Sequence, residues 1–133
     1  MTEFRRSNLR SGAPWETEVG YSRAVRVGRF IAVSGSAAID DKGRLVGEGD
    51  MYVQARQCIE VIGTALERAG GRLSDVVRTR IFVTDIGRWA DVGRAHQEVF
   101  GDVMPATSMV EVSRLIDARM LVEIEADAII GDA

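Results

Sequence analysis

The sequence is poor in the side chains that bind metals and close disulfides, because it has one cysteine, Cys58, and one histidine, His96. A lone cysteine excludes an intrachain disulfide and a zinc cage of thiolates. A transition-metal site would then have to rest mainly on carboxylates, which seldom hold such metals alone. We therefore expect neither a metal nor a cofactor.

The sequence also lacks the P-loop and G-x-G-x-x-G motifs, so no nucleotide-binding loop is encoded in recognisable form. No apolar run approaches the length that spans a bilayer. The start, MTEFRRSN, has no apolar core of a signal peptide. We therefore expect a cytoplasmic protein with no membrane partner.

Acidic residues slightly outnumber basic ones, because the chain has 20 Asp and Glu and 17 Lys and Arg, which gives a net charge of −3. Nucleic-acid binding normally needs a basic stripe, so this balance argues against a nucleic-acid partner.

The 133 residues fit one domain, 1–133, and a content of 46% apolar and 28% charged residues is typical of a soluble globular protein.

The last quarter of the chain has the clearest pattern. Two strand-like runs, Thr107–Val112 and Leu121–Ile130, flank a polar connection. The second run alternates apolar and acidic residues, so one face of the strand carries Glu123, Glu125 and Asp127. Neighbouring carboxylates repel one another, and the row must therefore face solvent, arginines or a polar pocket.

Two interpretations of this acidic row stay open. In the first, Arg78 and Arg80 alternate on another predicted strand and pair with the acids on a solvated face. In the second, one carboxylate has a catalytic role. The run Ser34-Gly35-Ser36 favours this second interpretation, because a glycine in a central strand permits close approach by a ligand. A buried carboxylate near such hydroxyls would orient and deprotonate a water.

Hydrophobic periodicity predicts two helices and five strands. Residues 1–20 are polar and are interrupted by Gly12, Pro14 and Gly20, so we expect a loop whose Trp15 covers an edge of the core. The expected elements are the strands Tyr21–Val27 and Phe30–Ala37, the helix Met51–Ala69 capped by Asp50, the strand Val76–Thr84, the helix Arg88–Phe100 and the two C-terminal strands.

This order predicts a two-layer α+β domain in which the helices cover one face of the sheet. The strands at 30–37 and 76–84 are apolar on both faces. The simplest way to bury the second face is against copies of the same chain, so we expect a homo-oligomer.

Three single residues each have a structural and a functional interpretation. His96 falls on the inner face of the second helix, where a packed, hydrogen-bonded histidine is favoured over a catalytic base. Cys58 lies on the apolar stripe of the first helix and is expected to be a small buried hydrophobe. Trp89 is either a core anchor or the wall of a substrate pocket.

Several segments occur in an order and spacing that indicate a known family. They include Val33-Ser34-Gly35, Val83-Thr84-Asp85-Ile86, Pro105-Ala106 and Leu121-Val122-Glu123-Ile124-Glu125-Ala126. Over nearly its whole length the chain resembles the YjgF/Rid (RidA-like) family. The resemblance implies a chorismate-mutase-like fold with a mixed sheet, and a homotrimer with clefts between neighbouring subunits.

Members of that family hydrolyse reactive enamines and imines, such as 2-aminoacrylate, to keto acids and ammonia. The resemblance assigns substrate contacts to Tyr21, Ser34 and Gly35, and a water-orienting role to Glu123. The family's carboxylate-binding arginine is replaced by Thr107. Threonine offers one neutral hydroxyl in place of two charge-assisted hydrogen bonds, a loss of roughly 100-fold in binding. The sequence thus resembles the branches that lack this arginine.

Arg23 stands where many relatives carry glutamine. It lies two residues after Tyr21 and therefore on the same strand face. One hypothesis is that Arg23 supplies the missing cation from the other side of the cleft. The alternative is an exposed strand arginine with no role in binding.

Three functions remain after these arguments. The first is water addition to an imine, enamine or related C–N metabolite, with Glu123 handling the water. The second is a non-catalytic trimer that binds a small metabolite or a partner enzyme, which Thr107 favours because a neutral ligand needs no cation. The third, endoribonuclease or translation inhibitor, is disfavoured by the acidic balance and by the lack of a histidine pair.

Overall fold

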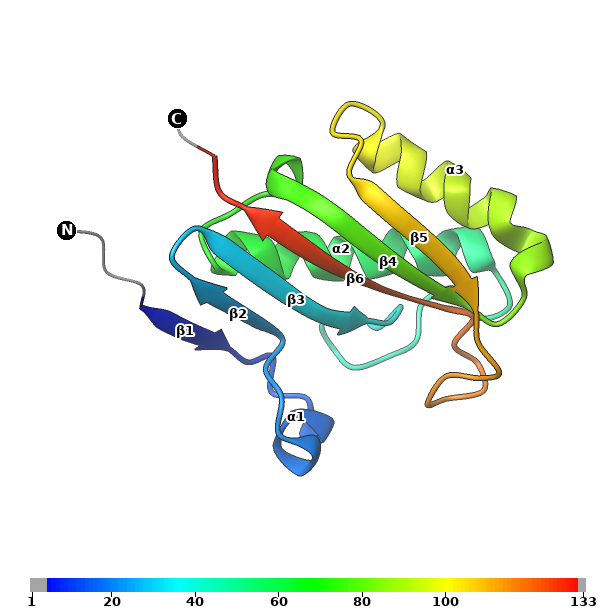
Figure 1. The fold of residues 1–133 in the computed structure, drawn as a ribbon. Coiled ribbons are helices and arrows are strands. Elements are labelled where there is room, and N and C mark those ends of the chain that lie inside the picture. The colour runs from blue at the N-terminus through cyan, green and yellow to red at the C-terminus, as the bar shows by residue number, and fades with distance from the viewer. Residues whose placement is uncertain (1–4, 132–133) are drawn as a thin grey trace.

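The computed structural model describes residues 5–131, which form one six-stranded sheet flanked by helices (Figure 1). The elements are β1 (Arg6–Leu9), α1 (Pro14–Val19), β2 (Ala24–Val27), β3 (Phe30–Ser36), α2 (Met51–Arg68), the 3-10 turn η1 (Leu73–Asp75), β4 (Val76–Val83), the 3-10 turn η2 (Ile86–Arg88), α3 (Trp89–Phe100), β5 (Ala106–Glu111) and β6 (Val122–Ile129).

The sheet has the strand order β1-β2-β3-β6-β4-β5. The pair β4–β5 is parallel and the other neighbouring pairs are antiparallel. The long helices α2 and α3 lie together on one face, as Figure 1 shows. The predicted two-layer α+β fold with a mixed sheet is therefore confirmed. No helix in residues 5–131 is both long and apolar enough to cross a membrane.

The helix α2 forms where its cap and its apolar stripe predict. The Asp50 side chain accepts a hydrogen bond of 3.0 Å from the Val53 N–H. Cys58, Ile59 and Ile62 are buried on the face that packs against the sheet, which confirms Cys58 as a core residue. The helix is followed by Gly70, whose positive φ of 91° suits glycine better than any other residue.

The predicted loop at residues 1–20 is wrong, because its described part forms β1 and α1. Pro14 occupies the first position of α1, and Gly20 caps its C-terminal end with a φ of 90°. Proline at the start and glycine at the end are typical of a helix. We expected them only to interrupt structure. Trp15 consequently lies on a helix, and the strand predicted to start at Tyr21 begins at Ala24.

The two faces of β6 differ as the alternation predicts. Ile124 and its apolar neighbours are buried under the helices, while Glu123, Glu125 and Asp127 are half-buried on the opposite face. Arg80 of β4 contacts Glu125 at 3.3 Å and Asp127 at 3.1 Å. The predicted pairing of the row with arginine is thus confirmed for Arg80 with these two acids, and Glu123 is left to a different environment.

Gln54 on α2 fixes the segment that leads into β6. Its side chain is buried. The Nε2 group donates to the Gly47 carbonyl at 3.1 Å and to the Arg119 carbonyl at 2.9 Å. The Oε1 atom accepts from the Leu121 N–H at 2.9 Å. This amide therefore holds the loop that carries Met120 and precedes Glu123.

We predict that Gln54→Leu lowers the free energy of unfolding by about 2–4 kcal/mol, because three backbone groups lose their partner. Urea denaturation measures this loss. Gln57→Leu is the matched control, since Gln57 makes one such bond, to the Ile39 carbonyl at 3.1 Å, and should cost about 1 kcal/mol or less. Equal losses in the two variants would contradict the role given to Gln54.

Candidate functional site

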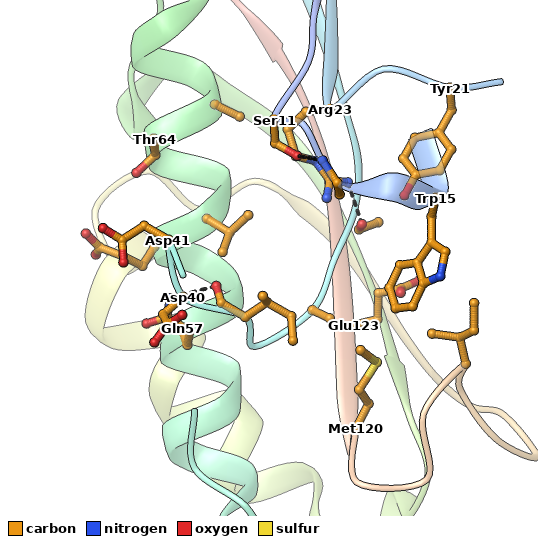
Figure 2. Close-up of a pocket in the computed structure, with 18 of the residues that line it drawn as sticks. Ser11, Trp15, Tyr21, Arg23, Asp40, Asp41, Gln57, Thr64, Met120 and Glu123 are labelled. Atoms are coloured by element: carbon orange, nitrogen blue, oxygen red, sulfur yellow. Dashed lines mark hydrogen bonds between the residues drawn. The ribbon is translucent and has the colours of Figure 1, made fainter. Parts of the chain in front are cut away.

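A cavity of about 780 Å³ opens where α1, the end of β3, one side of α2 and the loop before β6 meet. Its size falls within the range of small-molecule sites. Figure 2 shows the lining side chains, which come from these segments, from the stretches that flank α1 and follow β3, and from β6 itself. Of the residues expected to form a site, four line this cavity: Tyr21, Arg23, Gly35 and Glu123.

Gly35 and Glu123 are in direct contact. A Cβ atom at position 35 would lie 2.6 Å from Glu123 Oε2 and 2.9 Å from its carboxyl carbon, closer than real side chains approach. The register of β3 on β6 also changes between Val33 and Ser36, beside this contact. The space that the missing side chain of Gly35 leaves, which we predicted for a ligand, is therefore occupied by the carboxylate of Glu123.

Glu123 has the electrostatics of a base. Burial raises the pKa of its carboxyl above the usual value, the positive charge of Arg23 counteracts that rise, and the nearby Glu125 adds to it. A raised pKa makes a carboxylate a better proton acceptor near neutral pH. Titratable groups perturbed by burial inside a cavity are candidates for a functional role.

Arg23 lines the cavity and is held against Gly35. Its Nη2 donates to the Gly35 carbonyl at 2.5 Å, while Nε is buried without a hydrogen-bond partner among the described residues. Burial lowers the pKa of the guanidinium, and the nearby Tyr21, Glu16 and Glu123 favour its charged form. Arg23 is half-buried and precedes β2, so the alternative of an exposed strand arginine is wrong, while its role in binding stays a prediction.

Glu16 anchors α1 next to this group. Its carboxylate is buried and accepts hydrogen bonds from the Ser11 hydroxyl and from the Ser11 N–H at 3.0 Å. Burial alone would raise the pKa of Glu16. The two bonds from Ser11, a further hydrogen bond from the Gly12 N–H and the positive charge of Arg23 outweigh burial, so the pKa is lowered overall. The N–H groups of Gly20 and Tyr21 donate to the Glu16 carbonyl at 2.9 and 3.0 Å, so the helix is tied at both ends.

Sequence reasoning missed Trp15 and Glu16 as site residues. The available signal was Pro-Trp-Glu before Gly20, which places a proline and an acid in the first turn of a short helix. No periodicity could support that interpretation, because α1 has only six residues.

Three expected site residues lie outside this cavity in a single chain. Ser34 precedes Gly35, and its hydroxyl donates to the Ser22 carbonyl at 2.7 Å. The Thr107 hydroxyl lies 2.7 Å from that of Thr79, which is buried on the helix-covered face. Thr107 and Glu123 are therefore on opposite faces of the sheet. Trp89 is 60% exposed, so its interpretation as a core anchor is wrong.

His96 also lies outside the cavity that Glu123 lines. Its Nε2 lies 2.9 Å from the Thr79 hydroxyl oxygen, and its ring centroid is 4.7 Å from that of Phe100. Burial lowers the pKa of His96 and so favours the neutral ring. The predicted packed, hydrogen-bonded histidine is confirmed.

Comparisons with known proteins cover most of the chain. The family model described as Endoribonuclease L-PSP matches residues 12–130. The crystal structure of Rv2704 from Mycobacterium tuberculosis, a member of the YjgF/YER057c/UK114 family, superposes with a TM-score of 0.87 at 48% identity, covering 95% of this chain and 100% of that one.

Two sequence relatives extend the comparison. A RutC family protein from Pyrococcus abyssi is 40% identical over 81% of this chain and 84% of its own length. A protein from Salmonella typhimurium named 2-iminobutanoate/2-iminopropanoate deaminase is 36% identical over 82% of this chain and 86% of its own length.

Proposed function

Because the chain belongs to the YjgF/Rid family, which the Endoribonuclease L-PSP model describes, we propose that its cavity binds an imine or enamine metabolite and adds water to it. The observation that carries this proposal is the Glu123 carboxylate against Gly35, inside a cavity and with a raised pKa. Catalysis is thus assigned to Glu123, and binding to Tyr21, Arg23 and Gly35.

In this mechanism Glu123 orients a water and takes its proton as the oxygen attacks the imine carbon. Because the imine nitrogen is protonated at the outset, the attack gives a neutral carbinolamine. Glu123 returns the proton to the carbinolamine nitrogen, and the C–N bond breaks as Glu123 takes the hydroxyl proton and the carbonyl forms. The products are a keto acid and ammonia. The raised pKa of Glu123 suits both steps, because the same group first accepts and then returns a proton.

Arg23 supplies the cation that Thr107 cannot. Its guanidinium lines the same cavity as Glu123, and the hydrogen bond to the Gly35 carbonyl is made by Nη2 and not by Nη1. A carboxylate accepts two parallel hydrogen bonds from such a fork, which fixes the orientation of the adjacent reacting carbon. We therefore include a carboxylate in the substrate.

The complete site is proposed to form in a homotrimer. Apolar side chains remain exposed on strands of the sheet, at 43% for Phe30, 47% for Val110 and 46% for Ile129. In the proposed trimer, Thr107 and Trp89 of one subunit, which are both exposed, also lie at the Glu123 cavity of the next. Thr107 and Glu123 lie on opposite faces of the sheet within one chain, but in this arrangement Thr107 of one subunit and Glu123 of its neighbour share a cleft.

A second candidate is a non-catalytic trimer that binds a metabolite or a partner protein. The observation that favours it is Thr107, an exposed neutral side chain held by hydrogen bonds to Thr79 and to the Pro105 carbonyl. Ribonuclease activity has no comparable support, because the one histidine of the chain is engaged with Thr79 and Phe100.

We predict that the wild-type protein releases ammonia from enzymatically generated 2-aminoacrylate faster than the spontaneous reaction does. Thr107→Arg should change this rate by no more than about 3-fold, since Arg23 already provides the cation. A wild type at the spontaneous rate together with an active Thr107→Arg variant would favour the non-catalytic candidate. Inactivity of both proteins would reject hydrolysis of this substrate.

A further inference from the structure

The cavity has an apolar wall beside Arg23 and Glu123. Trp15 and Val19 of α1, together with Ile116 and Met120 of the segment before β6, form this wall. Figure 2 shows Trp15 next to Glu123, with Met120 below it. Trp15 is 40% exposed, Val19 73% and Ile116 69%. Exposed apolar side chains that gather at a cavity mark surface that a ligand covers.

The wall is pre-formed on its α1 side. Trp15 immediately precedes Glu16, whose carboxylate is buried and bonded to Ser11. The carbonyl of Glu16 accepts from the N–H groups of Gly20 and Tyr21 at 2.9 and 3.0 Å. A ligand that contacts Trp15 therefore meets a surface already ordered, which reduces the entropic cost of binding.

The cavity is also much larger than a three-carbon imino acid needs. Its volume of about 780 Å³ is that of a site for a far bigger molecule. A small acid held by Arg23 would leave the Trp15 side of the cavity filled with water. Arg23 and Glu123 lie beside the apolar wall, whereas Asp40, Asp41 and Glu60 line another part of the cavity. The end near Arg23 therefore suits a ligand that has both a carboxylate and an apolar side chain.

We propose that this site selects 2-imino acids with a bulky apolar side chain, such as benzyl or isobutyl. The carboxylate binds Arg23, the reacting carbon lies beside Glu123, and the side chain packs on Trp15 and Ile116. The inference rests on the proposed function for its choice of imino acids. The size preference itself is a binding property and holds for the stable 2-keto acids as well.

Calorimetry with pyruvate, 4-methyl-2-oxopentanoate and phenylpyruvate tests the preference without chemistry. We expect the two bulky acids to bind about 10- to 100-fold more tightly than pyruvate. Trp15→Ala should remove most of that difference, because it weakens the binding of the two bulky acids far more than that of pyruvate. Ile116→Ala, in a different segment, should act in the same direction. Ile86→Ala is the control, an apolar residue 38% exposed outside the cavity.

Equal affinities for the three acids, or an equal loss for all of them in Trp15→Ala, would overturn the proposal. A Trp15→Ala protein with a smaller assembly mass would also overturn it, because the wall would then be a subunit contact. Turnover of the corresponding imines separates the two claims. Tight phenylpyruvate binding without turnover refutes only hydrolysis, whereas turnover without a size preference refutes only the bulky side chain.

Discussion

Glu123→Gln is expected to lower kcat for imine hydrolysis by about 10²- to 10⁴-fold, the usual contribution of a general base. Glutamine keeps the shape of the side chain next to Gly35 but cannot accept the proton of the attacking water. Ammonia release under saturating substrate measures the loss. Glu125→Gln is the matched control, because Glu125 lies on the same face of β6 and contacts Arg80 instead.

The same variant is expected to be more stable than the wild type at pH 7. Burial, only partly offset by Arg23, raises the pKa of Glu123 in the folded protein. Folding is therefore penalised by the charged carboxylate at pH values above its folded pKa, and the penalty disappears below the unfolded value. Because the group is half-buried, we expect a rise in Tm of about 1–3 °C at pH 7 that vanishes near pH 4. A lower Tm at pH 7 would contradict the assigned environment.

Arg23→Gln is expected to raise KM for a carboxylate substrate by about 100-fold, since two charge-assisted hydrogen bonds are lost. Arg23→Lys should recover part of the affinity, because it restores the charge but not the planar fork. Arg94→Gln is the control. Arg94 lies over the ring of Tyr52, 3.8 Å from its centroid, and does not line the cavity.

A neutral substrate analogue such as the amide separates binding from folding. Its KM should be almost unchanged by Arg23→Gln, because the amide has no negative charge for Arg23 to bind. An equal rise in KM for the acid and the amide would show that Arg23 supports the cavity rather than the carboxylate.

Strand and helix patterns in the sequence predict most of this fold. The alternation along 121–130 identifies both faces of β6, and the stripe and Asp50 cap identify α2. These features are predictable because the buried face of a long element repeats with a fixed period. The helix α1 has no such repeat, and its position depends on tertiary bonds of Glu16 that local sequence does not reveal.

The candidate site is predictable only in part for a related reason. Tyr21 and Arg23 directly precede β2, Gly35 lies on β3 and Glu123 on β6, and these residues meet because β2, β3 and β6 are consecutive in the sheet. The position of Thr107 depends on register, since its pairing with Thr79 turns its side chain toward the helices. The ring of Trp89 lies over Gly93 on α3, where a Cβ would be in ordinary van der Waals contact 3.7 Å away, and it stays 60% exposed. Register and ring placement are not encoded in residue spacing.

The most direct test of the coupling between Arg23 and Glu123 is the pH dependence of kcat/KM in the wild type and in Arg23→Gln. The activity should rise with pH through the pKa of Glu123, because only its ionised form accepts a proton. Since Arg23 lowers that pKa, its removal should move the rise to higher pH. Profiles with the same midpoint in both proteins would contradict a shared site for these two residues.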